Sequence, residues 1–348
     1  MSSSTTPAAV GFAMPAEWKR HEATWIGWPH NKHDWPGKFA PIPWVFGEMA
    51  KALSRGEKVR VLVNDTVHET FARRVLNKCG ADMGNIEFFR FATNRGWTRD
   101  LGPVFVKKGA ENAIVNFKFN AWAKYPDWKK DNGIAPKVAK KLNKRLFDAQ
   151  HFVLEGGAID VNGCGTLLTT EECLLDTATQ VRNPGMGRAE TEDQLRALLG
   201  VTNILWLGKG IAGDDTHGHV DDLCRFVNSS TVALCRENNS HDPNYVLLEE
   251  NRERLQAMRL ENGGKVQVVE LPMPAPVIFN GQRLPASYAN FYIGNAAVIV
   301  PTFNDPKDRI ALGILSELFA DRPVVGIHAV DLVWGLGTLH CLTQQQPA

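Results

Sequence analysis

The sequence predicts an α/β protein built from five similar units, which we expect to close into a ring. One pattern recurs along the chain: a helix, a short strand of β-branched or aromatic residues, a loop, and a second strand that opens on a polar residue. A helix buries its apolar stripe only against a neighbouring sheet, and a ring leaves no sheet edge, so the openings should converge on one cavity. The polar residues at the openings are Asp100, Glu155, His219, Asn290 and Cys341, separated by 55, 64, 71 and 51 residues.

Composition agrees with a globular enzyme. The 348 residues are 44% apolar and 22% charged, and 39 Lys and Arg balance 38 Asp and Glu. A net charge of +1 provides no broad field for nucleic acid or anionic lipid. The first ten residues lack the basic start and apolar core of a signal peptide, and no apolar run approaches the ~18 residues that cross a bilayer. We therefore expect a cytoplasmic protein without nucleic-acid or membrane partners.

The first two units lie in the N-terminal half. Unit one has a helical pattern at 65–80, a strand at 86–92 and the polar opening in GWTRDLGPVFV at 96–106. Unit two runs from a helix at 135–148 to FVLEGGAIDV at 152–161. Gly102 and Pro103 in the first unit and two glycines after Glu155 in the second indicate a turn before the next strand.

The other three units repeat this order. Their helical segments are 188–200, 245–263 and 308–323, their first strands are 203–208, 266–272 and 324–330, and their openings are 213–227, 287–301 and 335–347. A doubly wound sheet would also alternate helices and strands, but no glycine-rich phosphate turn follows an early strand. The polar stretches at 107–113 and 235–244 are too short for interdomain linkers, so we predict a single domain over residues 1–348, with residues 1–10 as a flexible tail.

The densest polar cluster is GDDTHGHVDDLCRFV. On a strand, alternation would place His217, His219 and Asp221 on one face, where they could hold a divalent metal such as zinc. In a metal-free alternative, His219 is a general acid/base and Asp221 accepts a cationic substrate. A hydrogen-bonded turn before a strand would also explain the sequence Gly-Asp-Asp-Thr.

The openings of the first two units also carry candidate residues. Gly102 and Pro103 restrict the direction of Asp100, whereas Arg99 is equally well explained by an ion pair. Two glycines after Glu155 would let it point into a cavity, or would simply form a turn. Trp97 offers a flat apolar wall, although a core tryptophan is the commoner explanation.

The six cysteines are too sparse for a disulfide scaffold and form no CxxC pair, so we expect reduced thiols. Cys341, in GLGTLHCLTQQQP, is either a nucleophile or a buried structural cysteine. Its neighbour His340 would point to the opposite face of an extended strand, so another histidine of the ring must assist the thiol.

Together, a thiol, an imidazole and three carboxylates suit a planar guanidinium. Carboxylates grip its N–H fork and leave the central carbon open to a thiolate, and loss of ammonia followed by hydrolysis yields a ureido group. Acids near the thiol should also raise the pKa of Cys341 in the free enzyme.

The motifs TRDLGP, LEGG, GHVDD and GxGxxHCLTQQQP, with the opening GFAMPAEWKRHEATWIGWP, resemble the agmatine deiminase and bacterial peptidylarginine deiminase-like family of the guanidino-group-modifying superfamily. The resemblance extends from Gly11 to Pro347. It implies a five-bladed α/β propeller with pseudo-fivefold symmetry, no metal or organic cofactor, a small cationic guanidino substrate, and a homodimer as a candidate assembly.

By resemblance, Cys341 is the nucleophile, His219 the general acid/base, Asp100 and Asp221 the guanidinium carboxylates, and Glu155 the acid beside the histidine. The expected substrate contacts are Trp97, Arg99, Asn290 and His217. The expected reaction is conversion of agmatine to N-carbamoylputrescine and ammonia, a step toward putrescine and polyamine synthesis, with peptidylarginine or free arginine as the alternative substrate. Two other functions stay open: a metal-dependent hydrolase that uses His217, His219 and Asp221, and a non-catalytic binding propeller.

Overall fold

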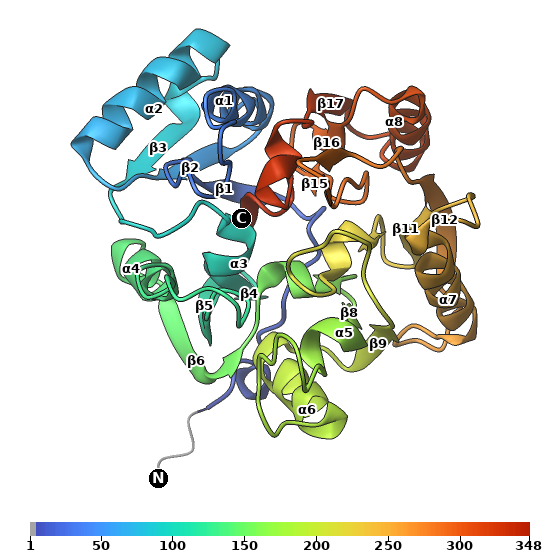
Figure 1. The fold of residues 1–348 in the computed structure, drawn as a ribbon. Helices are drawn as coiled ribbons and strands as arrows, with labels where there is room; N and C mark the ends of the chain where they lie inside the picture. The colour runs from blue at the N-terminus through green and yellow to red at the C-terminus, as the bar shows by residue number, and fades with distance from the viewer. Residues whose placement is uncertain (1–4) are drawn as a thin grey trace.

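The computed structural model describes residues 5–348, which form a mixed α/β fold. Figure 1 shows the sheets around a common centre, with the longer helices on the outside. Four sheets have three strands and one has four, and a small hairpin, β13 and β14, stands apart from them. The fold class predicted from the alternation of helices and strands is therefore correct at this level.

Each of the larger sheets repeats one connection. An antiparallel pair is followed by a helical crossover and a third strand that is parallel to the second. These sheets are β4 (Val104–Lys108), β5 (Glu111–Lys118) and β6 (Arg145–Val153); β7 (Asp160–Val161), β8 (Thr166–Thr170) and β9 (Asn203–Leu207); β10 (Cys224–Phe226), β11 (Thr231–Arg236) and β12 (Gln267–Pro272); and β15 (Tyr292–Ile293), β16 (Val298–Thr302) and β17 (Val324–His328). The hairpin is β13 (Ile278–Phe279) and β14 (Gln282–Arg283).

The four-stranded sheet joins the two ends of the chain. It contains β18 (Thr343–Pro347), β1 (His21–Gly27), β2 (Lys58–Leu62) and β3 (Ile86–Phe89), in that order. β1 pairs antiparallel with β18, with Trp25 opposite Gln344, and parallel with β2. The Trp25 indole also donates to Gln346 at 3.0 Å. The last strand of the chain is thus held by the first.

Local sequence signals set the helix ends. Asp65 accepts the His68 backbone N–H at the start of α2, and Gly80 ends that helix with a left-handed φ of 78°. Asp305 caps α8, with proline at its first position. The helices are α1 (Ile42–Leu53), α2 (Thr66–Cys79), α3 (Thr98–Leu101), α4 (Ile134–Lys141), α5 (Glu171–Leu174), α6 (Arg188–Leu199), α7 (Pro243–Ala257) and α8 (Pro306–Leu318). Short 3-10 turns are η1 (Ala8–Val10), η2 (Met83–Asn85), η3 (Asp131–Gly133), η4 (Gly156–Ala158), η5 (Val220–Asp222) and η6 (Leu332–Gly335).

The predicted polar openings precede strands but are not part of them. Asp100 lies in α3, Glu155 and His219 stand at the N-terminal ends of η4 and η5, and Asn290 and Cys341 come two residues before β15 and β18. The expectation that these residues are the first residues of strands is wrong, because a turn or a single helical turn precedes each of these strands. Strand alternation therefore cannot tell which side chains share a face.

The N-terminal tryptophans pack against the end of the chain. Trp25, Trp28 and Trp35 are buried in the largest hydrophobic cluster, and the Trp35 indole donates to the Leu332 carbonyl at 2.8 Å. Of the predicted flexible tail, residues 1–4 lie outside the described residues, whereas η1 packs against α6. Within residues 5–348, no helix combines the length and apolar character needed to cross a bilayer.

Candidate active site

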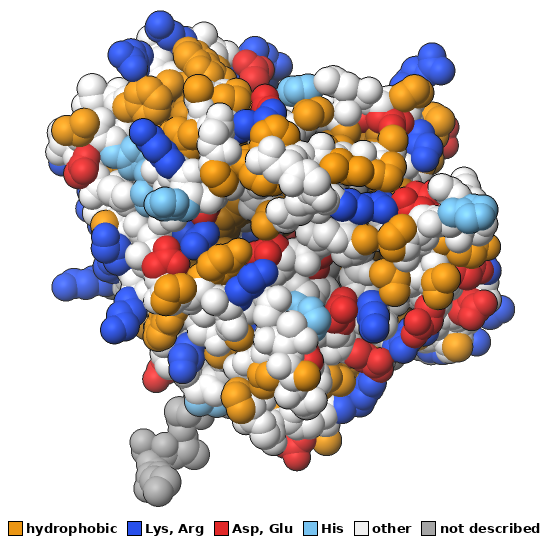
Figure 2. Space-filling view, in the orientation of Figure 1, with side chains coloured by type: hydrophobic (Ala, Val, Ile, Leu, Met, Phe, Trp, Pro, Cys, Tyr) orange, Lys and Arg blue, Asp and Glu red, His pale blue; other side chains and the backbone are white. Residues whose placement is uncertain are grey.

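Loops that precede several sheets surround a cavity of about 160 Å³. The face seen in Figure 2 is hollowed near its middle, with acidic, basic and hydrophobic side chains around the hollow. Two of the predicted catalytic residues, Asp100 and Cys341, line the cavity, together with Trp97. Its other lining residues are His33, Asp34, Arg95, Trp122, Tyr125, Asp215, Thr216, Gly335, Leu336 and Gly337.

The thiol of Cys341 is buried among polar groups. The Asn290 side-chain amide lies 3.1 Å from Sγ, and Asp221 Oδ2 lies 3.8 Å from it. Asn290 Oδ1 accepts the His340 backbone N–H at 3.0 Å and the Thr338 hydroxyl at 2.7 Å, which turns its NH₂ group toward the sulfur. Asn290 therefore orients the thiol and can donate to a thiolate.

The electrostatic surroundings keep this thiol protonated. Burial raises the pKa of Cys341 well above its usual value, and the carboxylates of Asp221, Asp222 and Asp100 raise it further. The direction is the one that the sequence predicts. Burial is the largest cause of the raised pKa, and Asp222 is one of the contributing acids although it was not among the predicted site residues.

His219 lies between two carboxylates. Nδ1 is 3.9 Å from Asp100 Oδ1, and Nε2 is 3.9 Å from Glu155 Oε2. Burial lowers the pKa of His219, but Asp100, Cys173 and Glu155 outweigh it, so the pKa is well above the usual value. The neighbouring carboxylates therefore favour the protonated imidazole, the form that a general acid requires.

Asp100 connects the cavity to His219. Its Oδ2 accepts the Trp122 indole N–H at 2.8 Å, and its Oδ1 accepts the Gly157 backbone N–H at 3.0 Å. Burial raises the pKa of Asp100 to about 6 against the opposing charge of His219. A Cβ at Gly157 would stand 2.5 Å from the His219 ring, so the second glycine of LEGG allows this close approach.

Glu155 is held ionised by a buried arginine. The Arg182 guanidinium contacts Glu155 Oε1 at 3.3 Å, and both side chains are fully buried. Burial raises the pKa of Glu155, but Arg182 and His219 outweigh burial and hold the pKa at about 2. This supports a permanent negative charge beside His219.

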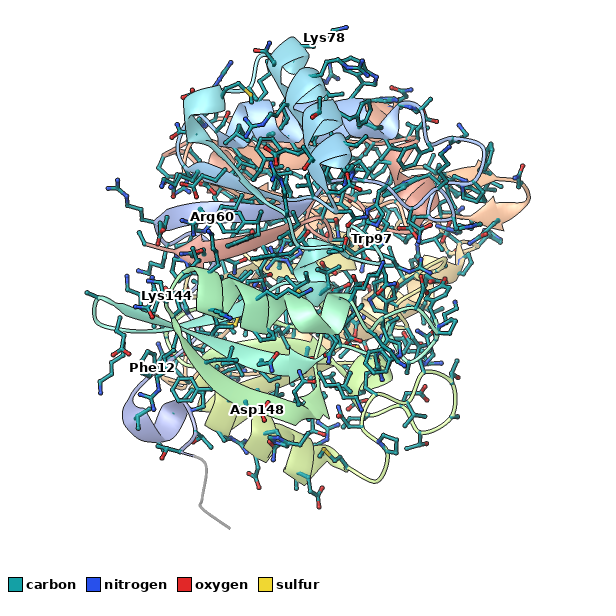
Figure 3. The ribbon with its side chains drawn as sticks, turned by 90° about the vertical axis from the view of Figure 1, so that its left-hand side faces the viewer. Phe12, Arg60, Lys78, Trp97, Lys144 and Asp148 are labelled. Atoms are coloured by element: carbon teal, nitrogen blue, oxygen red, sulfur yellow. The ribbon has the colours of Figure 1, made fainter. Side chains whose placement is uncertain are left out.

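Trp97 forms a wall of the cavity. Its ring lies 5.3 Å from that of Trp35, and the backbone of Gly335 and Gly337 approaches it so closely that a Cβ at either glycine would stand 2.9 Å from the ring. Figure 3 places Trp97 inside the molecule, between the N-terminal sheet above and the sheet of β4 to β6 below. The glycines of GLG therefore let the loop before Cys341 pass over an aromatic surface.

Three predicted substrate contacts do not line the cavity. Arg99 is buried in an ion pair with Glu17 at 3.1 Å, which agrees with its alternative explanation, although the partner is distant in sequence. Asn290 contacts the thiol from within the protein. His217 lies 3.2 Å from Asp176, outside the cluster, because its backbone adopts a left-handed φ of 62° in a turn rather than a strand.

The predicted metal set is not assembled. Among the described residues, the groups with potential ligand atoms within 4.8 Å of one another are Glu155, Cys173 and His219, and Asp221, Asp222 and Cys341. His217 belongs to neither, so the face that the HxHxD pattern predicts does not form.

Sequence reasoning missed the cavity wall around Trp122. Ala121, Trp122 and Ala123 all have left-handed φ angles of 52° to 59°, and this unusual turn brings the Trp122 indole to Asp100. No glycine marks this turn in FNAWAKYPDW, so its conformation had no sequence signal.

Comparison with known proteins agrees with this site. The sequence pattern of the family described as Porphyromonas-type peptidyl-arginine deiminase matches residues 13–347. The chain belongs to this family. Agmatine deiminase of Pseudomonas aeruginosa, strain LESB58, is 38% identical in sequence, and the match covers 99% of this chain and 98% of the relative. Agmatine deiminase of Medicago truncatula is 37% identical with the same coverage.

Solved structures of the family are similar throughout. Agmatine deiminase of Enterococcus faecalis matches with a TM-score of 0.92 and 33% identity, covering 99% of this chain and 98% of that one. A cysteine-to-serine variant of C. jejuni agmatine deiminase with substrate bound matches with a TM-score of 0.87 and 31% identity, covering 97% and 96%.

Proposed function

We propose that this protein is a deiminase that hydrolyses agmatine to N-carbamoylputrescine and ammonia, with Cys341 as its nucleophile. The observation that carries the proposal is a buried thiol at the wall of a small cavity that Asp100 and Trp97 also line. A cavity of about 160 Å³ suits a small ligand. Relatives named agmatine deiminase support the choice of substrate.

The substrate guanidinium would lie against Trp97, with its N–H groups donating to Asp100 and Asp221. Its positive charge offsets the carboxylates that oppose ionisation of Cys341, so the thiol releases its proton to solvent as substrate binds. Asn290 then donates to the thiolate. Binding and activation of the nucleophile are coupled in this scheme.

The thiolate attacks the guanidinium carbon, forming a C–S bond while the C=N electron pair moves to nitrogen. His219 gives its proton to the departing nitrogen, the C–N bond breaks, and ammonia leaves a cationic thiouronium on Cys341. Neutral His219 next takes a proton from water, whose oxygen attacks the same carbon. The C–S bond breaks, the hydroxyl proton passes to sulfur, and the ureido product is released.

The cavity mouth favours agmatine over arginine. Arg95 is the one Lys or Arg among the described lining residues, and its guanidinium is already paired with Asp34 and Asp127. It also lies over Tyr125, 4.3 Å from the ring centroid. A substrate carboxylate would thus meet acidic groups and an arginine whose two terminal nitrogens already contact carboxylates.

The same proposal covers the architecture. The five sheets around one centre are the blades of an α/β propeller with pseudo-fivefold symmetry, and residues 1–348 form one deiminase domain. The shared connection of the sheets supports this interpretation.

Turnover assays test the function. Ammonia and ureido product should form from agmatine, at least about tenfold more slowly from arginine or a blocked peptidylarginine, and not at all with folded Cys341→Ser. Activity that disappears with EDTA and returns with zinc would instead indicate a metal-dependent hydrolase. A folded protein that converts no guanidine would indicate a binding propeller.

A further inference from the structure

His340 precedes the nucleophile but contacts two carboxylates behind it. Its Nδ1 lies 2.6 Å from Asp221 Oδ2, and its Nε2 lies 2.8 Å from Glu17 Oε2. All three side chains are buried. Ionised carboxylates only accept hydrogen bonds, so the imidazole satisfies both at once only as a doubly protonated cation.

Glu17 is firmly anchored. It contacts Arg99 at 3.1 Å and Arg225 at 3.0 Å, and its Oε1 accepts the Ile293 backbone N–H at 2.9 Å. Burial raises the pKa of Glu17, but Arg225, His340 and Arg99 outweigh it and hold the pKa well below its usual value. The N-terminal segment therefore places a fixed negative charge behind His340.

We propose that His340, held by Glu17, is a positioning residue that keeps Asp221 ionised and oriented for the guanidinium. The inference rests on the proposed deiminase function. His340 acts through Asp221 and does not line the cavity. The second oxygen of Asp221, Oδ1, is buried and has no hydrogen-bond partner among the described residues, and in this proposal it receives a substrate N–H.

Asp221 needs cations near it because it is buried and lies close to Asp222, Asp100 and the Cys341 thiol. Burial raises its pKa, but His340, His219 and Arg225 together hold the pKa below its usual value, and His340 is the largest of these three causes. The charged groups that face it are Asp222 and His219 from its own segment, Asp100 from α3, Arg225 from β10 and the Cys341 thiol. The carboxylates near His340, besides Asp221, are those of Glu17 and Asp160. The Tyr292 ring also lies beside the imidazole.

The test is the acid limb of kcat/KM for agmatine, measured in variants of the full chain. Both substitutions remove the positive charge. The His340→Gln amide can still contact Glu17 but not Asp221, whereas the His340→Asn amide can still donate to Asp221. In the unsubstituted enzyme Asp100, with a pKa of about 6, sets this limb. Loss of the imidazolium raises the pKa of Asp221, and we expect Asp221 to set the limb in the variants, at about one unit higher pH in His340→Gln and with a smaller shift in His340→Asn. At pH 6 the one-unit shift corresponds to about a fivefold loss in kcat/KM, mainly through KM.

His21→Asn is the matched control. His21 is another buried imidazole, which contacts Glu57 at 3.1 Å and the Glu17 carbonyl at 2.6 Å but does not contact Asp221. The His21→Asn substitution should lower Tm without moving the acid limb of kcat/KM. Glu17→Gln gives a second route, with an expected shift in the same direction, if the His340 variants do not fold.

An unchanged acid limb in the folded variants, with only a lower Tm as in His21→Asn, would overturn the inference. Failure of the proposed function is distinguishable, because the unsubstituted protein would then convert no agmatine at any pH.

Discussion

At Cys341, burial and three carboxylates act on one thiol in the same direction. A neutral thiol is a poor nucleophile, so reactivity should depend on a cation placed over it. We therefore expect the free enzyme to resist alkylation and the thiolate to form mainly in the substrate complex.

Alkylation tests this dependence. Iodoacetamide should inactivate the free enzyme slowly at pH 7, and the rate should rise about tenfold for each pH unit, because only the thiolate reacts. Loss of activity with time is the measurement. Rapid inactivation that does not change with pH near neutrality would reveal a preformed thiolate paired with His219.

Asp100 sets a second pH dependence. Its pKa is raised to about 6, and only the ionised carboxylate attracts a guanidinium. The value of kcat/KM for agmatine should therefore fall as pH decreases through about 6. Trp122→Phe removes an N–H donor that lowers this pKa, so its limb should lie at higher pH than that of the unsubstituted enzyme. A limb that stays in place would show that another group controls binding.

Elements outside the cavity contribute stability without taking part in the chemistry. At the start of α8, the Asp305 side chain accepts the Lys307 backbone N–H, and the Asp308 side chain accepts the Asp305 backbone N–H. This capping box fixes a helix that contacts β17 and β12, away from Cys341.

Asp305→Ala should therefore lower the free energy of unfolding by about 1 kcal/mol and leave kcat unchanged. Denaturant titration and the agmatine assay measure the two effects. Asp308→Asn is a milder companion change, because an amide still accepts hydrogen bonds. A large loss of kcat in Asp305→Ala would show that α8 communicates with the site.

Across the whole molecule, the chain ends depend on each other. β18 lies between β1 and the N-terminal part of β4, and Gln345 and Gln346 of β18 contact Arg99 and Arg60. Without β18, these buried arginines lose their hydrogen bonds to the two glutamines, and β1 becomes a sheet edge.

A chain that ends at Leu342 should therefore fail to fold cooperatively and lose activity, whereas a chain that ends at Pro347 should retain both. Thermal unfolding and agmatine turnover provide the comparison. A shortened chain with the Tm of the longer one would contradict this role of β18.

The sequence alone determined the α/β alternation, the order of the five polar openings and the family motifs, because helix periodicity, caps and Gly-Pro turns are local signals. It also identified Cys341, His219, Asp100, Asp221 and Glu155, which the structure brings into one connected cluster. Their places at the openings of the repeated units and in the family motifs identified them.

Only the tertiary structure decided which way the side chains turn. His217 contacts Asp176 rather than the residues around His219, and Asn290 faces the thiol. His340 contacts Glu17, which lies 323 positions earlier in the chain. These directions depend on left-handed turns and on packing between distant segments. Such long-range contacts produce no periodic pattern in the sequence, so the sequence alone does not predict them.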